Sequence, residues 1–544
     1  MTIAAPLSEL LLRLNGPRVA ELERAIPAVC DALEAGHVCL PLAEAGLDAT
    51  RLRACAVVGT PGEFKPLILD SAGRLYLHRY WRYEHSLALA LRARAAAPPC
   101  AHDAQLLRET TQHYLTNAGD AQRAAASAFV QNTLGIITGG PGTGKTRTAA
   151  MALLLLAEQC AAAGQRARFA LAAPTGKAAA RLSQSLASTL ESLPVSPAIR
   201  TLLPASASTL HRLLGSRPGT TEFRHDASNP LPLDALIVDE ASMVALPLMA
   251  RLLAALRPST RLLLLGDSHQ LASVEAGHVL GDLCASPLCS HVTELEENYR
   301  FSGDSGIYQL SRAVNAGDPN AVHTLLAGPP ADLTAVHLPA PSALLATLRA
   351  PVLDGFRTFL TAATPREALD AFDAFRILCA LREGPYGVSH LNRLAEEVLD
   401  DAGLITPARA HYSGRPILIL RNDPALGLFN GDIGIIRPDT DGQLRAFFPD
   451  DTGGVRSFSP ARLPEHETAF AMTVHKSQGS EFSRVLIVLP DGESPILSRE
   501  LLYTAITRAR KSVALWWSEP ALAAALDRRV TRHSGLVDQL TTAS

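Results

Sequence analysis

The sequence predicts an α/β protein with several domains, in which helices cover two parallel sheets. Its 544 residues allow three or four domains at roughly 150 residues each. In two separate stretches of the chain, short apolar segments alternate with helical segments, which is the pattern of a parallel sheet with helices on both faces. Hydrophobic residues make up 47% of the chain and charged residues 19%, which is typical of a folded globular protein rather than a disordered one.

Residues 1–112 are predicted to form a mainly helical N-terminal domain. We expect helices over 20–35 and 86–97, on either side of a hairpin over 66–83. The hairpin prediction rests on the turn residues Asp70–Gly73 and on the alternating apolar residues that flank them. Core packing is favoured for the aromatic cluster of this segment, with a surface for a docked partner as the alternative: Tyr76, Tyr80, Trp81 and Tyr83.

The first α/β unit is assigned to residues 113–330, and the second to residues 331–408 and 467–544. The buried strands expected in the first unit are 134–138, 169–173, 235–238 and 261–265, and those expected in the second are 376–381, 485–489 and 512–516. Residues 409–466 interrupt the second unit with short β-like runs separated by Gly, Asn and Asp turns. We therefore predict a small β-barrel insertion there.

Composition and charge argue against several classes of protein. The chain has no apolar run of about 18 residues and no basic region before its first apolar stretch, so we expect neither a membrane span nor a secretion signal, and a cytoplasmic location. Its eight cysteines form no C-x-x-C pair, which disfavours a zinc site. With a net charge of −3, any nucleic-acid site must be a local groove.

The segment GGPGTGKT at residues 139–146 fits the phosphate-binding pattern G-x-x-x-x-G-K-[ST]. It follows an apolar strand and precedes an apolar helix, which is the context that the pattern requires. Glycines let backbone N–H groups surround phosphates, and the start of the helix adds a favourable dipole. Lys145 is expected to reach the β- and γ-phosphates, and Thr146 to offer its hydroxyl to Mg²⁺.

Two further apolar strands end in polar groups that suit nucleotide hydrolysis. Asp239 and Glu240 follow the strand 235–238; we expect Asp239 to hold Mg²⁺ and Glu240 to polarise the attacking water. Gln270 follows the strand 261–265 and could sense the γ-phosphate. Because the carboxyl ends of parallel strands open onto one crevice, these groups are expected to lie together.

The order of these motifs resembles the series of superfamily 1 helicases. The shared motifs are Gln122, GGPGTGKT, APTGKA at 173–178, TLH at 209–211, DEAS at 239–242, GDSHQ at 266–270, NYR at 298–300, TVHKSQGSE at 473–481 and YTAITRAR at 503–510. Within that superfamily, further stretches resemble the RecD family: RLYLHRYWRYE, NPLPLD, LREGPYGVSHLN, LFNGDIG and RVTRHSGL. The resemblance covers nearly the whole chain, with residues 330–375 the least distinctive.

The resemblance implies a fold and a set of site residues. The fold is two RecA-like P-loop NTPase domains with a small SH3-like β-barrel insertion in the second and the N-terminal domain in front. The catalytic residues implied are Lys145, Asp239, Glu240, Gln270, Arg300 and Arg508, where the two arginines neutralise the transferring γ-phosphate across the cleft. Gln122 is implied to read the adenine, Gly479 and Glu481 to lie near the γ-phosphate and ribose, and Thr146 and Asp239 to hold Mg²⁺. The full set of implied contacts with ATP is Gln122, Gly140, Pro141, Gly142, Thr143, Gly144, Lys145, Thr146, Arg147, Gly479 and Glu481.

The DNA contacts are the less specific part of the resemblance. Thr, Lys and backbone N–H groups suit phosphate contacts that ignore base sequence. The implied contacts are Pro174, Thr175, Lys177, Thr209, His211, Thr473, His475 and Lys476. Lys177 and Lys476 are two of only five lysines in the chain, which favours a functional role. Base stacking by Tyr412, Phe429 or Tyr503 is weighed against core packing, and residues 215–234 are either a strand-splitting hairpin or a plain loop.

We therefore expect an ATP-dependent 5′→3′ DNA helicase that acts with RecB-like and RecC-like subunits on duplex ends in double-strand-break repair. The polarity and the partners come from the resemblance alone. No cluster of carboxylates and lysine resembles a nuclease site, so nuclease activity is expected to reside in another subunit. Two alternatives stay open: a stand-alone RecD-like helicase, and a regulatory ATPase subunit without independent unwinding.

Overall fold

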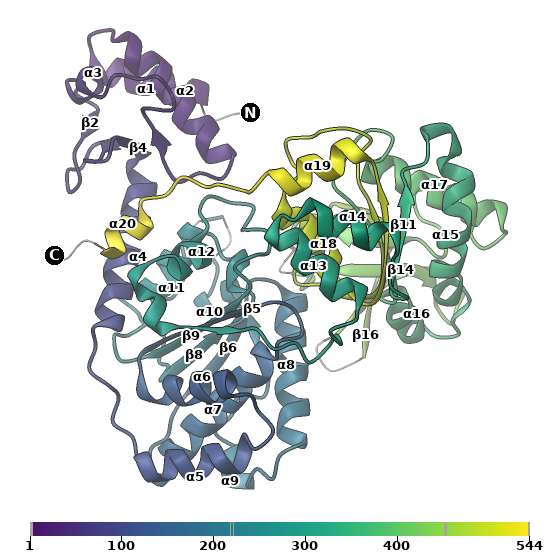
Figure 1. The fold of residues 1–544 in the computed structure, drawn as a ribbon, viewed down its shortest axis with the longest axis horizontal. Helices are drawn as coiled ribbons and strands as arrows, with labels where there is room; N and C mark the ends of the chain where they lie inside the picture. The colour runs from purple at the N-terminus through teal and green to yellow at the C-terminus, as the bar shows by residue number, and fades with distance from the viewer. Residues whose placement is uncertain (1–3, 218, 221, 424, 451–453, 542–544) are drawn as a thin grey trace.

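The computed structural model describes residues 4–541, apart from 218, 221, 424 and 451–453. Two α/β units lie side by side, the first at the lower left of Figure 1 and the second at the right, and a small N-terminal domain sits above the first. None of the helices in the described part of the chain is both long and apolar enough to cross a membrane.

The N-terminal domain packs two helices and a short helix against a small sheet. The helices are α1 Ala4–Asn15, α2 Ala20–Glu34 and α3 Ala49–Arg53, and the strands, in sheet order, are β1 Leu40–Pro41, β4 Arg74–Leu77, β3 Leu67–Leu69 and β2 Val58–Gly59. Strands β3 and β4 form the predicted hairpin around Asp70–Gly73. The domain is thus less helical than expected.

The long helix α4, His78–Ala95, begins eight residues earlier than the sequence suggested. Tyr80, Trp81 and Tyr83 therefore lie on a helix and not on the hairpin. Buried residues recur along α4 every three or four positions, at Trp81, Glu84, Leu87, Ala88 and Leu91, and this periodicity overrides the short alternation that resembled a strand. Trp81 and Tyr76 are buried in the core, as the core-packing interpretation predicted.

The first α/β unit is built on a parallel sheet with helices on both faces. Its strands, in sheet order, are β10 Val292–Leu295, β5 Leu134–Gly139, β9 Arg261–Gly266, β8 Ala235–Val238, β6 Phe169–Ala173 and β7 Ser208–Thr209. Its helices are α5 Ala104–Tyr114, α6 Asp120–Gln131, α7 Lys145–Ala162, α8 Gly176–Glu191, α9 Pro197–Arg200, α10 Leu210–Leu214, α11 Leu246–Ala254 and α12 Val279–Cys284. The four predicted strands are confirmed; β7 and β10 escaped prediction because they are short and rich in polar residues.

The second unit holds another parallel sheet. Its strands, in sheet order, are β11 Leu333–His337, β20 Ala509–Trp517, β19 Phe482–Val488, β12 Phe375–Cys379 and β18 Ala471–Thr473. Its helices are α13 Gly306–Ala316, α14 Pro319–Ala327, α15 Leu344–Thr361, α16 Pro365–Phe372, α17 Val388–Asp401, α18 Arg499–Thr507 and α19 Glu519–Asp527. Ile307 and Leu310 of α13 share a core with Val485 and Leu515, so in the structure the unit begins before the expected residue 331.

The segment 409–466 folds as an antiparallel sheet, as its turn-rich sequence suggested. The strands, in sheet order, are β16 Val455–Phe458, β15 Leu444–Pro449, β14 Ile433–Pro438, β13 Pro416–Ile419 and β17 His466–Thr468. Ile417, Ile436 and Phe448 form its own small core. Strands β16 and β17 are the edges of the described ladder, so closure into an SH3-like barrel stays a prediction.

The C-terminal tail leaves the second unit, to which it was assigned by sequence. After α19 the chain, yellow in Figure 1, runs back to α20, Leu536–Thr541, which lies beside α4. Leu536 and Leu540 are buried in one core with Trp81 and Leu87. The tail thus connects the second unit to the N-terminal domain. Local patterns in the sequence do not predict this contact between distant parts of the chain.

Candidate functional site

The glycine-rich loop between β5 and α7 has the backbone of a phosphate cradle. Gly142 has φ +86° and Gly144 has φ +83°, a left-handed conformation that glycine adopts readily. A Cβ atom on Gly142 would lie 2.6 Å from Cβ of Arg300 and 2.7 Å from Oδ1 of Asn298. Glycine at 142 is therefore required by both backbone conformation and space.

Neighbouring side chains hold this loop from two directions. Gln122 on α6 donates from Nε2 to the carbonyl of Thr143 over 3.1 Å, and Asn298 donates from Nδ2 to the carbonyl of Pro141 over 2.8 Å. The ammonium of Lys145 donates to the carbonyls of Gly139 and Gly140 over 2.6 and 3.0 Å. Lys145 therefore sits at the mouth of the loop, where a phosphate could take the place of these carbonyls.

The remaining predicted loop contacts surround Lys145. The carbonyl of Gly142 accepts from the N–H of Tyr299 over 2.9 Å, and Arg147 is exposed on the first turn of α7. Asn298 and Tyr299 were noted in the sequence only as flanks of Arg300, yet they contact the loop directly.

Asp239 and Glu240 stand opposite the loop, at the end of β8. Thr146 donates from Oγ1 to Oδ2 of Asp239 over 3.3 Å, which brings together the two predicted Mg²⁺ ligands. Burial, and then the negative charge of Glu240, raise the pKa of Asp239 to about 6. Among the described residues, Glu240 is the one non-glycine residue with a positive φ, at +53°. Strain of this kind is typical of functional sites, where the surrounding structure holds it in place.

A chain of buried hydrogen bonds crosses from the first unit to the second. Arg508, 2% exposed, donates to Oε1 of Gln270 over 2.6 Å and to the carbonyl of Ser480 over 3.1 Å. Gln270 and Tyr503 both donate to Oδ2 of Asp267, over 3.0 and 2.9 Å. Burial lowers the pKa of Arg508, while the charges of Glu240 and Glu481 oppose that shift. The structure thus brings Gln270 and Arg508 together across the cleft.

Glu481 lies at the centre of an arginine cluster that also spans both units. Its carboxylate pairs with Arg181 over 2.6 Å, Arg510 over 2.8 Å and Arg300 over 3.1 Å. Burial alone would raise the pKa of Glu481, but the guanidinium groups hold that pKa well below its ordinary value. The expected contact of Glu481 with the ribose stays a prediction, since its oxygens here face arginines.

The predicted DNA contacts lie at strand ends in both sheets. Thr175 and Thr209 accept N–H groups at the starts of α8 and α10, and Thr473 accepts the N–H of Lys476. The two lysines are each paired with an acid: Lys177 with Asp373 over 3.2 Å and Lys476 with Glu467 over 2.7 Å. Pro174 directly follows β6, and His475 lies two residues after β18. His211 is exposed on α10, its ring 5.8 Å from that of Phe223.

The units touch at these strand ends. A Cβ atom on Gly479 would lie 3.2 Å from Oγ1 of Thr175, so the backbone of the second unit passes close to the first. Arg181, in the second turn of α8, was not singled out in the sequence, because one arginine on a helix, among many in the chain, carries no signal. Its position four residues after Lys177, on the same helix face, was the only available pointer.

The aromatic candidates for base stacking divide into two kinds. Tyr412 and Tyr503 are 6% and 5% exposed, and their hydroxyls donate to Glu396 and Asp267, so core packing describes both. Phe429 is half-buried on the insertion and stays a candidate. In the segment 215–234, an antiparallel bridge joins Ser216 to Phe223, and positions 218 and 221 lie outside the described residues.

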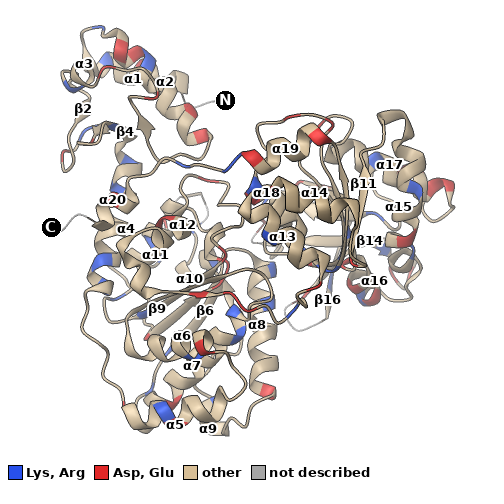
Figure 2. Cartoon of the chain, in the orientation of Figure 1, with Lys and Arg blue, Asp and Glu red and all other residues tan. Residues whose placement is uncertain are grey.

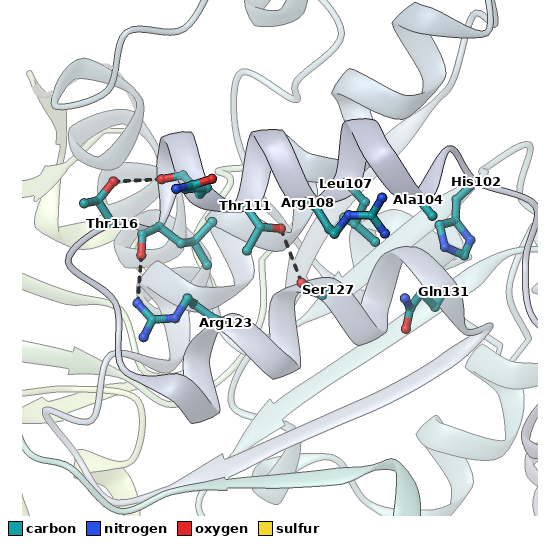
Figure 3. A pocket seen from close by; sticks show the side chains of 11 residues that line it. His102, Ala104, Leu107, Arg108, Thr111, Thr116, Arg123, Ser127 and Gln131 are labelled. Atoms are coloured by element: carbon teal, nitrogen blue, oxygen red, sulfur yellow. Dashed lines mark hydrogen bonds between the residues drawn. The ribbon is translucent and has the colours of Figure 1, made fainter.

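A separate groove of about 530 Å³ lies between α5 and α6 (Figure 3). Thr111 and Ser127 share a hydrogen bond across it, and Arg123 donates to the carbonyl of Leu115 at one end. Gln122 precedes Arg123 but points to the phosphate loop, so the groove and the loop lie on different faces of α6. None of the predicted site residues lines this groove.

Two family models match the chain in the regions that form the cleft. An AAA domain model matches residues 122–276, and a UvrD-like helicase C-terminal domain model matches residues 468–516. The first contains the phosphate loop, Asp239 and Gln270, and the second contains Glu481 and Arg508.

Curated relatives match over most of the chain. The RecBCD enzyme subunit RecD of Mycolicibacterium smegmatis is 40% identical over 541 residues, which cover 96% of this chain and 94% of the relative. The subunit of the same name from Haemophilus influenzae is 34% identical and covers 85% of this chain and 80% of its own length. The ATP-dependent RecD2 DNA helicase of Deinococcus radiodurans is 32% identical over 86% of this chain and 59% of the relative.

Proposed function

This chain belongs to the RecD family, and from that premise we propose that it is an ATP-dependent DNA helicase that moves 5′→3′ along single-stranded DNA. We further propose that it works as the RecD-like subunit of a RecBCD-type exodeoxyribonuclease complex, unwinding duplex ends in double-strand-break repair. The polarity, the RecB-like and RecC-like partners and the process follow from the family.

The observation that carries the motor function is the shared cleft. Lys145, Thr146 and Asp239 come from the first unit, and Arg508 of the second reaches Gln270 of the first through a buried hydrogen bond of 2.6 Å. A nucleotide in the cleft would be enclosed from both sides. Its γ-phosphate would attract Arg300 and Arg508, because planar guanidinium groups suit bidentate phosphate contacts. Binding then favours closure of the units, and hydrolysis with loss of the phosphate favours reopening.

The donor set fits a magnesium ion beside the nucleotide. Thr146 and Asp239 offer a hydroxyl and a carboxylate oxygen 3.3 Å apart, and hard oxygen ligands are those Mg²⁺ prefers. The raised pKa of Asp239 is consistent with a crowded pair of acids whose charge a divalent cation would offset. Thr146 and Asp239 would hold the ion, and its positive charge would offset the negative charge of the phosphate oxygens. Glu240 would orient and polarise the attacking water.

The single strand is proposed to lie across the strand ends that carry Thr175, Lys177, Thr473 and Lys476. A DNA phosphate would compete with Asp373 for Lys177 and with Glu467 for Lys476, so strand binding exchanges one ion pair for another. Because these contacts involve the backbone of the strand and not its bases, binding is expected to be independent of sequence and to weaken with salt.

Strand displacement by the full chain on duplexes with a 5′ or a 3′ tail tests the proposal, with Lys145→Gln as the inactive variant. Lys511→Gln is the matched control, since Lys511 is exposed on β20 and is not one of the predicted site residues. We expect unwinding from the 5′ tail only, lost in Lys145→Gln and kept in Lys511→Gln. Unwinding from the 3′ tail only would overturn the polarity.

The two alternatives give other results in the same experiment. Processive unwinding by the chain alone, with no increase when RecB-like and RecC-like partners are added, would favour a stand-alone helicase. A folded chain that hydrolyses ATP without unwinding from either tail, alone or with partners, would favour a regulatory ATPase subunit.

A further inference from the structure

Arg181 connects the two α/β units at the point where the candidate DNA and nucleotide sites meet. It lies on α8 of the first unit and donates from Nη1 to the carbonyl of Gly479 over 3.1 Å. Its Nη2 pairs with Oε2 of Glu481 over 2.6 Å. One guanidinium group therefore holds both a backbone carbonyl and a carboxylate of the second unit.

Helix α8 places Arg181 in line with the candidate DNA contacts. The helix begins beside Thr175, which caps it, and Lys177 lies four residues before Arg181 on the same face. Figure 2 shows the basic positions of α8 toward the end of the helix that faces the second unit. Because an α-helix is stiff over one turn, a displacement at Lys177 also moves Arg181.

Arg181 also faces the candidate catalytic acids. Burial alone would lower the pKa of its guanidinium, but the carboxylate of Glu481, with smaller contributions from Glu240 and Asp239, raises that pKa above its ordinary value. The positive charge of Arg181 thus interacts with the carboxylate of the second unit and, more weakly, with the acid pair of the first. Moving it changes the electrostatic surroundings of both.

The partner of Arg181 restrains one of the proposed phosphate-binding arginines. Arg300 donates to Oε1 of Glu481 over 3.1 Å, while Arg181 holds the other oxygen of the same carboxylate. The Glu481 side chain is 9% exposed, so little water is at hand to replace a lost partner. The orientation that Arg181 imposes on Glu481 therefore helps to decide where Arg300 points.

We propose that Arg181 is a positioning residue that couples binding of the single strand at Lys177 to ATP hydrolysis. In the structure, Lys177 pairs with Asp373, and Glu481 contacts both Arg181 and Arg300. A strand phosphate on Lys177 shifts the start of α8, and Arg181 draws Glu481 with it, which releases Arg300 to the γ-phosphate. This inference rests on the proposed function, because it presupposes DNA-dependent ATP turnover at this cleft.

The test measures ATP turnover by the full chain with and without oligothymidylate, for wild type, Arg181→Gln and Arg181→Lys. The matched control is Arg510→Gln, because Arg510 pairs with the same Oε2 atom of Glu481 but belongs to the second unit, as Glu481 does. We expect Arg181→Gln to lower the ratio of DNA-stimulated to DNA-free turnover by about tenfold, within the usual range of coupling between sites. For Arg181→Lys, which keeps the charge but not both contacts, this ratio should lie between those of wild type and Arg181→Gln. For Arg510→Gln, the ratio should stay within about twofold of wild type.

Two further readouts distinguish positioning from loss of structure. For Arg181→Gln we expect the kcat measured with DNA to fall while KM for ATP and the melting temperature stay close to wild type. A wild-type stimulation ratio in Arg181→Gln would overturn the inference. An equal loss of the stimulation ratio in Arg510→Gln would do the same, as would a parallel fall of the DNA-stimulated and DNA-free turnover rates in Arg181→Gln. A wild-type chain whose ATP turnover DNA does not stimulate would instead overturn the proposed function.

Discussion

Two buried glutamates occupy opposite environments in this protein. Glu481, in the cleft between the α/β units, is surrounded by the guanidinium groups of Arg181, Arg300 and Arg510. Glu84, in the joint between α4 and the C-terminal tail, is fully buried and accepts from neutral donors. Those donors are the Oγ of Ser534, the N–H of Gly535, the amide of Gln539 and the hydroxyl of Tyr76, at 2.8–3.2 Å.

The two environments move the pKa of a glutamate in opposite directions. Burial raises the pKa of Glu84, and its neutral donors, together with the charge of nearby Arg74, only partly offset that shift. In the cleft, the arginines hold the pKa of Glu481 below its ordinary value. Partners in the cleft can therefore be exchanged, since a guanidinium group can pass from a carboxylate to a phosphate. The joint is built to stay closed, because its donors are fixed around one acceptor.

The largest expected effect is on chemistry in the cleft. Glu240→Gln removes the group that polarises water and should lower ATP turnover by about 10²–10⁴-fold, the usual contribution of a general base. The melting temperature should stay near wild type, because the amide keeps the shape of the side chain. Steady-state ATP hydrolysis and a thermal melt measure both. Turnover above a tenth of wild type would show that Glu240 is not the group that polarises the attacking water.

The next effect is on stability at the joint. Glu84→Ala leaves the buried donors around it without an acceptor and should lower the free energy of unfolding by about 3 kcal/mol. Urea unfolding followed by circular dichroism measures this, with the exposed Glu9→Ala on α1 as the control. ATP turnover well below the melting temperature should be retained. A midpoint that matches Glu9→Ala would show that the joint contributes little.

The two glutamates should give pH dependences of opposite sign. For Glu84, whose pKa is raised on folding, the stabilising contribution is present at low pH and is lost as the pH rises above about 4.5. For Glu481, whose pKa is lowered, the contribution is present above about pH 4.5 and is lost as the pH falls below it. A tenfold difference in proton affinity between the folded and unfolded chain corresponds to about 1.4 kcal/mol of stability.

Unfolding between pH 3.5 and 7 of wild type, Glu84→Gln and Glu481→Gln would separate these contributions. The stability of Glu84→Gln relative to wild type should increase as the pH rises, whereas that of Glu481→Gln should increase as the pH falls. Parallel curves for the two variants would contradict the contrast between cleft and joint.

The smallest expected effect concerns a neutral donor inside the cleft. Tyr503→Phe removes the hydroxyl that donates to Asp267 over 2.9 Å and should cost about 1–2 kcal/mol of stability. Turnover should fall only a few-fold, because Gln270 still donates to the same carboxylate. Urea unfolding and ATP hydrolysis, with Tyr308→Phe on α13 as the control, measure the two changes. A loss as large as that of Glu240→Gln would place Tyr503 in the chemistry itself.

The features that were predictable from sequence are those that depend on residues adjacent to one another in the chain. The phosphate loop at 139–146 and the acids at 239–240 each follow an apolar strand, so composition and order sufficed. Strands β5, β6, β8, β9, β12, β19 and β20 were found because their apolar runs are buried on both faces. Strands β7, β10, β11 and β18 lack such runs, and their neighbours in the sheet, rather than their own residues, make them strands.

The two parallel sheets, the β insertion and the chemical groups of the cleft were therefore predictable from local patterns in the sequence. Three features emerge only when the chain is folded: α13 joins the second unit, the tail returns to α4, and Arg181 and Arg300 both contact Glu481. Local patterns do not predict these contacts, because periodicity and motifs are properties of short stretches of the chain. An ion pair between residues 300 positions apart, such as Arg181 and Glu481, depends on how whole domains pack, and in sequence each arginine looks like any other.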